Sequence, residues 1–146
     1  MTEYVVGLAF SEQKDRIVLI KKKRGPAQLI GKWNGVGGHL EVGELPGAAM
    51  VREFKEETGV ETTHDQWTEF MQLEGTDWAV VFFYCISNAT QAARTTEDEV
   101  VGSWYVNNLP HMDHLAPNLR WIIPMALNHR RDRVEVYRVE EAIHTK

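Results

Sequence analysis

The stretch that decides the fold is residues 38–60, GHLEVGELPGAAMVREFKEETGV. Pro46 suits the first turn of a helix, and Gly59 suits the left-handed residue just past a helix end. The stretch therefore predicts a helix over residues 46–58. Its spacing of i, i+3 and i+4 puts three carboxylates on one face: Glu53, Glu56 and Glu57. We expect the opposite side to pack on a sheet through Gly47, Ala48, Val51, Phe54 and Thr58.

Three carboxylates on one helix face repel one another, so some would take up protons at a raised pKa unless a cation lies between them. Mg²⁺ prefers oxygen ligands and is usually shared with substrate phosphates. The pattern therefore predicts Mg²⁺, with Mn²⁺ as a substitute, and a phosphate-bearing substrate. Arg52 lies four residues before Glu56 and can brace it. The alternative is a solvated acidic helix face, which is common on surface helices.

The segments around this helix indicate an α/β or α+β layered domain. Residues 4–10 and 16–22 are apolar and β-branched, and the polar SEQKD between them predicts a hairpin. Further strands are expected over 67–74, 78–87 and 100–106, and a second helix from Pro117 to about Arg130. The glycine-rich residues 33–45 indicate close backbone approach. Residues 133–139 alternate valines with polar residues, which fits either an added strand or a frayed end.

The bulk composition limits the function classes. A chain of 146 residues fits one domain, and its net charge of −5 argues against an extended nucleic-acid surface. No apolar run approaches a membrane span, and the start MTEYVVGLAF lacks the marks of a secretory signal. Cys85 is the only cysteine, so an internal disulfide is impossible and a reducing, cytoplasmic location is expected. Its apolar neighbours indicate a core residue rather than a catalytic thiol.

Taken with its spacing, the central stretch resembles the complete Nudix box, G-x5-E-x7-R-E-U-x-E-E-x-G-U, where U is a bulky apolar residue. The match runs from Gly38 through Glu44 to the segment 52–60, with Phe54 as an aromatic variant at the first U. This full spacing leaves little room for the acidic-surface alternative. The resemblance implies a Nudix fold, an α/β/α sandwich with a central mixed sheet and a loop-helix-loop catalytic motif. It implies one Nudix hydrolase domain over 1–146, with the box at 38–60.

The resemblance also implies roles for the residues of the box. Glu56 and Glu57 would be the principal metal ligands, and Glu53 a ligand or the base that activates water. Arg52 and Glu44 would orient these groups, and the carbonyl of Gly37 would be a further ligand. Outside the box, Glu99 matches an additional catalytic, metal-binding carboxylate of MutT-like enzymes, with Glu97 and Asp98 as second choices and a solvated turn as the alternative.

Residues 31–38, GKWNGVGG, resemble the G-x-W-N-G-x-G-G run of oxidised-purine nucleotide hydrolases, which makes Asn34 a candidate for base contact. Asn118 is a second candidate, and the alternative for it is a helix N-cap. Lys22 is a candidate phosphate contact, and the alternative for it is a solvent-exposed residue at the end of a strand. His39 departs from the lysine usual in those enzymes. Either stacking on a base or packing in the core would suit Trp78 and Phe83.

The leading hypothesis is Mg²⁺-dependent hydrolysis of a nucleoside triphosphate, such as 8-oxo-dGTP, to the monophosphate and pyrophosphate. The alternative enzyme acts on ADP-ribose, a dinucleotide polyphosphate or capped RNA. A third hypothesis, from another class, is a non-catalytic Nudix-fold binding module, although such modules tend to lose box carboxylates. The expected partner is a small nucleotide, with no membrane and no extended nucleic acid. The chain would be a monomer or a homodimer, and self-pairing of residues 133–139 is one route to a dimer.

Overall fold

Strand β1 (Thr2–Phe10) lies at the centre of a mixed eight-stranded sheet in this computed structural model, which describes residues 1–130 and 132–139. It pairs in parallel with β6 (Trp78–Ile86) over nine residues, and antiparallel with β2 (Arg16–Lys21) and β4 (Val36–His39). The main strand order is β3-β2-β1-β6-β5-β8. In that order β3 is Trp33–Asn34, β5 is Thr68–Glu74 and β8 is Glu135–Arg138. Strand β7 (Val101–Tyr105) pairs with β2.

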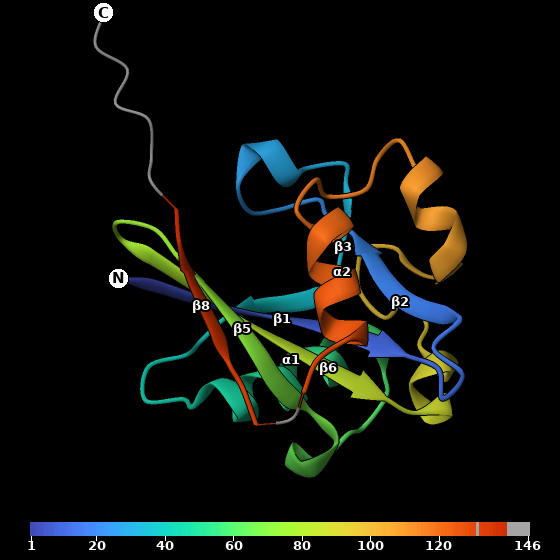
Figure 1. Ribbon diagram of the computed structural model, residues 1–146, viewed down its shortest axis with the longest axis horizontal. Helices are drawn as coiled ribbons and strands as arrows, with labels where there is room; N and C mark the ends of the chain where they lie inside the picture. Colours follow the sequence, from blue (N-terminus) through green and yellow to red (C-terminus); the bar gives the residue numbers. More distant parts are fainter. Residues whose placement is uncertain (131, 140–146) are drawn as a thin grey trace, which may run out of the picture.

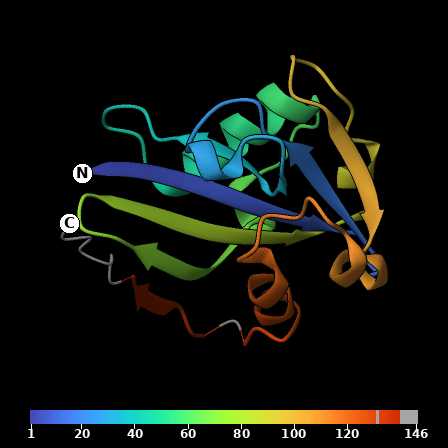
Figure 2. The ribbon, with the colours of Figure 1, turned by 90° about the horizontal axis from the view of Figure 1, so that it is seen from above.

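Two helices cover opposite faces of the sheet, as Figures 1 and 2 show. Successive residues of a strand point to opposite faces, so β1 contributes Leu8 and Phe10 to the core under α2 (Leu119–Leu127) and Val5 and Ala9 to the core under α1 (Pro46–Thr58). The expected sandwich, with a central mixed sheet between helices, is confirmed. Single 3₁₀ turns complete the connections: η1 Ala27–Leu29, η2 His64–Gln66, η3 Asn88–Ala92 and η4 Val106–His111.

Helix α1 has the bounds that the sequence predicts. Gly59 follows it at φ 79°, and its N–H bonds to the carbonyl of Lys55, which is the expected left-handed cap. The predicted packing face is partly wrong. Phe54 and Thr58 are buried and Val51 packs against the core as expected, but Gly47 and Ala48 are only partly buried, and Ala49 and Met50 are the buried residues at that end of the helix. This rotation of the helix toward the sheet also buries Glu57.

The predicted strands are present to within two residues at their ends. The second helix is shorter than expected, because Asn128 leaves helical geometry and its side-chain amide donates to the carbonyl of Pro124. The glycine-rich segment contains β3 and β4, and Gly35 and Gly37 lie against the backbone of β1, so the expected close backbone approach is confirmed. Residues 135–138 form a true strand, parallel to β5, so the frayed-end alternative is wrong.

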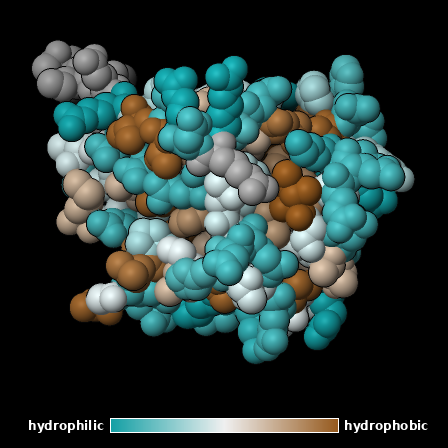
Figure 3. Space-filling view, turned by 60° about the horizontal axis from the view of Figure 1, so that its bottom comes forward, coloured by the Kyte–Doolittle hydropathy of each residue, from teal (hydrophilic) through white to brown (hydrophobic). Residues whose placement is uncertain are grey.

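None of the helices within the described residues has both the length and the apolar character that crossing a bilayer requires. The face shown in Figure 3 is mostly hydrophilic, and its apolar patches are separate from one another.

Candidate active site

An open cleft of ≈ 1190 Å³ lies between the Nudix-box helix, the strands β1 and β6, and the loop after β2. It collects most of the residues that the sequence predicts for the site, although they come from five distant segments. Those that line it are Lys22, Asn34, Gly37, Arg52, Glu53, Glu57, Glu99 and Asn118. Glu44 and Glu56 are outside the lining and contact Arg52 instead.

The carboxylates of α1 differ sharply in their surroundings. Glu57 is buried, with 8% of its surface exposed, and its Oε2 atom has no hydrogen-bond partner. Burial is the main cause that raises the pKa of Glu57 to about 8, and the positive charge of Lys22 opposes the rise. Burial also raises the pKa of Glu53, against the effect of Arg52. Glu56 is half exposed.

Arg52 makes five hydrogen bonds to four residues of the box. Its guanidinium donates to Glu44 at 2.7 and 2.9 Å, to Glu53 at 2.8 Å, to Glu56 at 3.2 Å and to the carbonyl of His39 at 3.0 Å. The expected contact with Glu56 is therefore confirmed. The Arg52 guanidinium also lowers the pKa of Glu44 to about 2. Arg52 thus ties the loop that precedes α1 to the helix face that carries the glutamates.

Two glycines of β4 lie where a side chain would disturb the site. A Cβ added at Gly37 would lie 1.8 Å from the carbonyl oxygen of Val5 in β1, so this position requires glycine for space. A Cβ added at Gly38 would lie 2.7 Å from Oε1 of Glu53, so it would displace that carboxylate. Gly37 also lines the cleft, where the resemblance expects its carbonyl to serve as a ligand.

Glu99 is 3% exposed and is held from the side of the loop after β2. Its Oε2 accepts from the backbone N–H of Lys23 at 2.6 Å and of Arg24 at 3.2 Å, and its Oε1 lies 3.4 Å from Nζ of Lys22. The solvated-turn alternative is therefore wrong for Glu99. It does describe Asp98, which is exposed and pairs with Arg24.

Within the described residues, no three acidic, histidine or cysteine side chains already converge as metal ligands. Arg52 and Lys22 instead supply the positive charge beside the carboxylates. The donors still fit a hard divalent cation, since Glu53 and Glu57 offer only oxygen and Oε2 of Glu57 is buried without a partner. Such an atom normally has a partner in a folded protein.

Amide groups lie on the other side of the cleft. Asn34 is buried, and its Oδ1 accepts from the N–H of Gly35. Asn118 precedes α2, but its side chain makes no capping bond, and its Oδ1 is buried without a partner. The N-cap alternative for the Asn118 side chain is therefore wrong. Both amides lie where a ligand in the cleft would meet them.

The apolar wall of the cleft was only partly predicted. Trp78, Val80 and Phe82 alternate along β6 and all line the cleft, whereas Phe83 points to the opposite face and packs in the core under α1. Trp78 and Phe83, the two aromatic candidates, are an odd number of residues apart in one strand, so their side chains point to opposite faces of the sheet. Alternation from Trp78 was the signal that would have identified Phe82.

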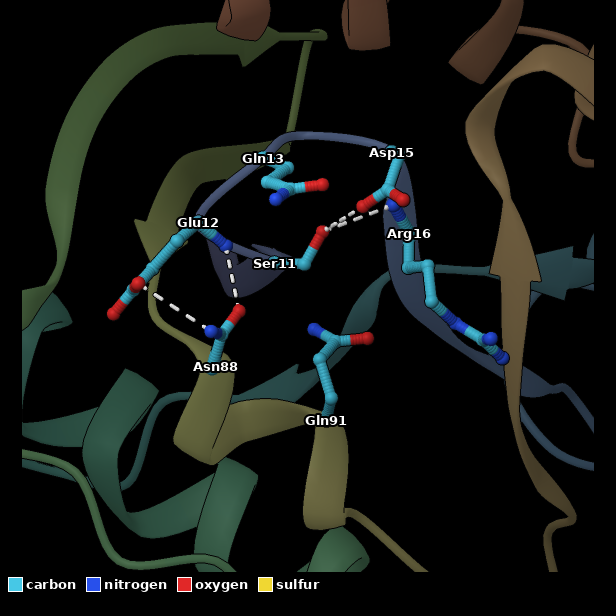
Figure 4. Close-up of a pocket in the computed structure, with 7 residues that line it drawn as sticks. All are labelled: Ser11, Glu12, Gln13, Asp15, Arg16, Asn88 and Gln91. Atoms are coloured by element: carbon cyan, nitrogen blue, oxygen red, sulfur yellow. Dashed lines mark hydrogen bonds between the residues drawn. The ribbon is translucent and has the colours of Figure 1, made fainter.

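A smaller polar cavity of ≈ 370 Å³ lies at the hairpin between β1 and β2, and none of the predicted site residues is in its lining (Figure 4). Its side chains largely satisfy one another: Ser11 donates to Asp15, and Asn88 donates to Glu12 and accepts from that residue's N–H. We therefore assign the chemistry to the larger cleft.

Comparison with known proteins agrees with this geometry. The model of the NUDIX domain matches residues 1–124. The chain is 30% identical over 134 residues to an oxidized purine nucleoside triphosphate hydrolase of Danio rerio, covering 89% of this chain and 83% of the relative. It is 24% identical over 102 residues to the 8-oxo-dGTP diphosphatase of Escherichia coli, covering 70% and 78%.

Solved structures show the same fold. A MutT structure from work on Aliivibrio salmonicida and Vibrio cholerae superposes with a TM-score of 0.68 at 20% identity, covering 88% of this chain and 98% of that one. The NUDIX domain of Shewanella oneidensis NrtR, solved with ADP ribose, gives 0.67 at 17% identity and covers 83% of each chain. With the domain model spanning most of its length, the chain belongs to the Nudix family of hydrolases.

Proposed function

We propose that this protein hydrolyses a nucleoside triphosphate to the monophosphate and pyrophosphate, with Mg²⁺ as cofactor and an oxidised purine such as 8-oxo-dGTP as substrate. The observation that carries the proposal is the buried, unpartnered Oε2 of Glu57, which lies in the same cleft as the unpartnered Oδ1 of Asn118. The carboxylate oxygen of Glu57 suits a cation, and the amide oxygen of Asn118 suits a hydrogen-bond donor on a base.

The side chains of the cleft divide the work. Glu53 and Glu57, with the carbonyl of Gly37, would hold Mg²⁺, which neutralises phosphoryl charge and acidifies a bound water. Arg52 keeps Glu53 in place, and Glu44 keeps Arg52 in place. Water attacks a phosphorus of the linkage between the α- and β-phosphates, its proton passes to a carboxylate of the box, and the α–β anhydride bond breaks to give the monophosphate and pyrophosphate.

Glu56 is the one box ligand whose side chain lies outside the cleft lining, since it accepts from Arg52. Glu56 and Glu99 would add carboxylate oxygens for the cation, and Arg52 would still be held by Glu44 and Glu53. Lys22, which now pairs with Glu99, would supply positive charge for a phosphate.

Asn34 and Asn118 would read the base. An amide both donates and accepts, as the edge of a purine requires. The names of the relatives from Danio rerio and Escherichia coli support an oxidised purine. The protein is proposed to act on free nucleotides, and its cytoplasmic location and its oligomeric state stay predictions.

The test is a hydrolysis panel with the full chain, comparing 8-oxo-dGTP, dGTP, ADP-ribose, a dinucleotide polyphosphate and capped RNA, with Mg²⁺ or with EDTA. We expect Mg²⁺-dependent release of pyrophosphate, with 8-oxo-dGTP the best substrate. Glu57→Gln should abolish this release. Turnover of ADP-ribose or dinucleotides without triphosphates would replace the proposed substrate, and no turnover by folded protein would favour a binding module.

A further inference from the structure

Residues 94–99, which lie between η3 and β7 in the chain, bridge the end of the box helix and the basic loop after β2 through hydrogen bonds. We call this segment the strap. Its first half contacts α1: the N–H of Arg94 donates to the carbonyl of Thr58 at 3.0 Å, and Oγ1 of Thr96 donates to the carbonyl of Glu56 at 2.5 Å. Its second half contacts the loop through Asp98 and Glu99. The strap therefore touches both sides of the cleft.

The contact of Thr96 satisfies a group that a helix leaves open. The last four carbonyls of a helix have no partner within it, and unpartnered final turns fray. In α1 the carbonyl of Lys55 accepts from Gly59, and the carbonyl of Glu56 accepts from Thr96. The side chains of Glu56 and Glu57 project from this final turn, so their direction depends on its staying wound.

The strap also packs tightly against the residue that ends the helix. A Cβ added at Gly59 would lie 3.2 Å from Cζ of Arg94 and 3.3 Å from Cγ2 of Thr96. Thr96 is exposed, and its hydrogen bond to Glu56 places its hydroxyl over the last turn of α1. The neighbouring Thr95 bonds elsewhere: its Oγ1 accepts from the N–H of Val101 at the start of β7 and, within the described residues, makes no hydrogen bond to α1.

We propose that Thr96 is a positioning residue, which holds the last turn of α1 so that Glu56 and Glu57 keep the geometry needed to bind a divalent cation. The proposal rests on the metal-dependent function proposed above. Residues that orient metal ligands typically change metal affinity by 10- to 100-fold when they are replaced. Because Thr96 acts through the backbone and is exposed, we place its effect at the lower end.

The experiment measures Mn²⁺ binding to the full chain by titration without nucleotide. Thr96→Val should weaken binding about tenfold, and Thr96→Ala, which adds no methyl group in place of the hydroxyl, carries the same expectation if the valine variant folds poorly. Thr96→Ser keeps the hydroxyl and should bind within about twofold of wild type. The matched control is Thr95→Val, which loses one strap hydrogen bond away from the helix and should also stay within about twofold.

Thermal melting in EDTA establishes that all four variants are folded before the titrations are compared. Unchanged Mn²⁺ affinity in both hydroxyl-less Thr96 variants would overturn the inference, as would an equal loss in Thr95→Val, since a loosened strap would then be the cause. If wild type itself fails to bind Mn²⁺, the proposed function and this inference both fail. If wild type binds and hydrolyses but Thr96 is indifferent, only this inference fails.

Discussion

Replacing Glu57 by glutamine should stabilise the metal-free protein while removing its response to divalent cations. Glu57 is buried, its Oε2 has no partner, and burial raises its pKa to about 8. Folding therefore places a carboxylate where its charged form is disfavoured. Glutamine has nearly the same shape and carries no charge, so it removes that penalty together with one proposed metal ligand.

The size of the gain follows from the burial. A buried polar group without a partner costs about 1–3 kcal/mol, and more when it is charged. Glutamine still places an amide there, so we expect a net gain of about 1–2 kcal/mol in EDTA at pH 7, or roughly 2–8 °C in the melting temperature. The pKa of Glu57 is about 8 in the folded protein and about 4.5 in the unfolded chain. Between these two values the unfolded chain loses its proton first, so Glu57 lowers the stability of the wild-type protein more and more as the pH rises from about 4.5 to 8. The gain should therefore be larger at pH 8.5 than at pH 5.

The assay is thermal or urea unfolding of both proteins in EDTA and with a titration of Mg²⁺. The matched control is Glu56→Gln, the same substitution on the same helix turn at a half-exposed side chain that accepts from Arg52. It should change metal-free stability by no more than about 0.5 kcal/mol. Wild type should gain stability as Mg²⁺ rises, through binding to the folded state alone. Lower stability of Glu57→Gln in EDTA, or an undiminished Mg²⁺ response, would refute the reasoning.

Three further predictions test other parts of the structure. Asn118→Ala should lower kcat/KM for 8-oxo-dGTP about tenfold with little change in melting temperature, because its Oδ1 has no partner to lose; steady-state kinetics beside a melting curve decide this. Gly37→Ala should destabilise the fold by roughly 3 kcal/mol in urea unfolding, because the new Cβ would meet the carbonyl of Val5, whereas Gly47→Ala, which meets only a side chain, should cost much less. Burial raises the pKa of Cys85 to about 11, so its thiol should react far more slowly with a disulfide reagent at pH 8 in the native protein than in urea. Its contribution to stability should fall as the pH rises from about 9 to 11. Equal reaction rates in the native and urea-unfolded protein would contradict the buried placement.

The sequence alone determined the elements whose pattern is local. The bounds of the box helix follow from Pro46 and Gly59, and the strands follow from β-branched runs between polar turns. Several candidate residues of the cleft could also be predicted from the sequence, because Glu53, Glu57 and Asn34 occur at fixed spacings in motifs. These features depend on interactions within a few residues of the chain, which a single sequence displays directly.

Only the tertiary structure decided which of those residues share surroundings. The rotation of α1 on the sheet buries Glu57 and leaves Glu56 half exposed, although both carry the same side chain on the same turn. The parity of β6 turns Phe82 toward the cleft and Phe83 toward the core. The contact between Thr96 and Glu56 joins residues 40 positions apart. Such outcomes arise from packing between distant segments, where burial, charge and space are set jointly by neighbours that no local pattern identifies.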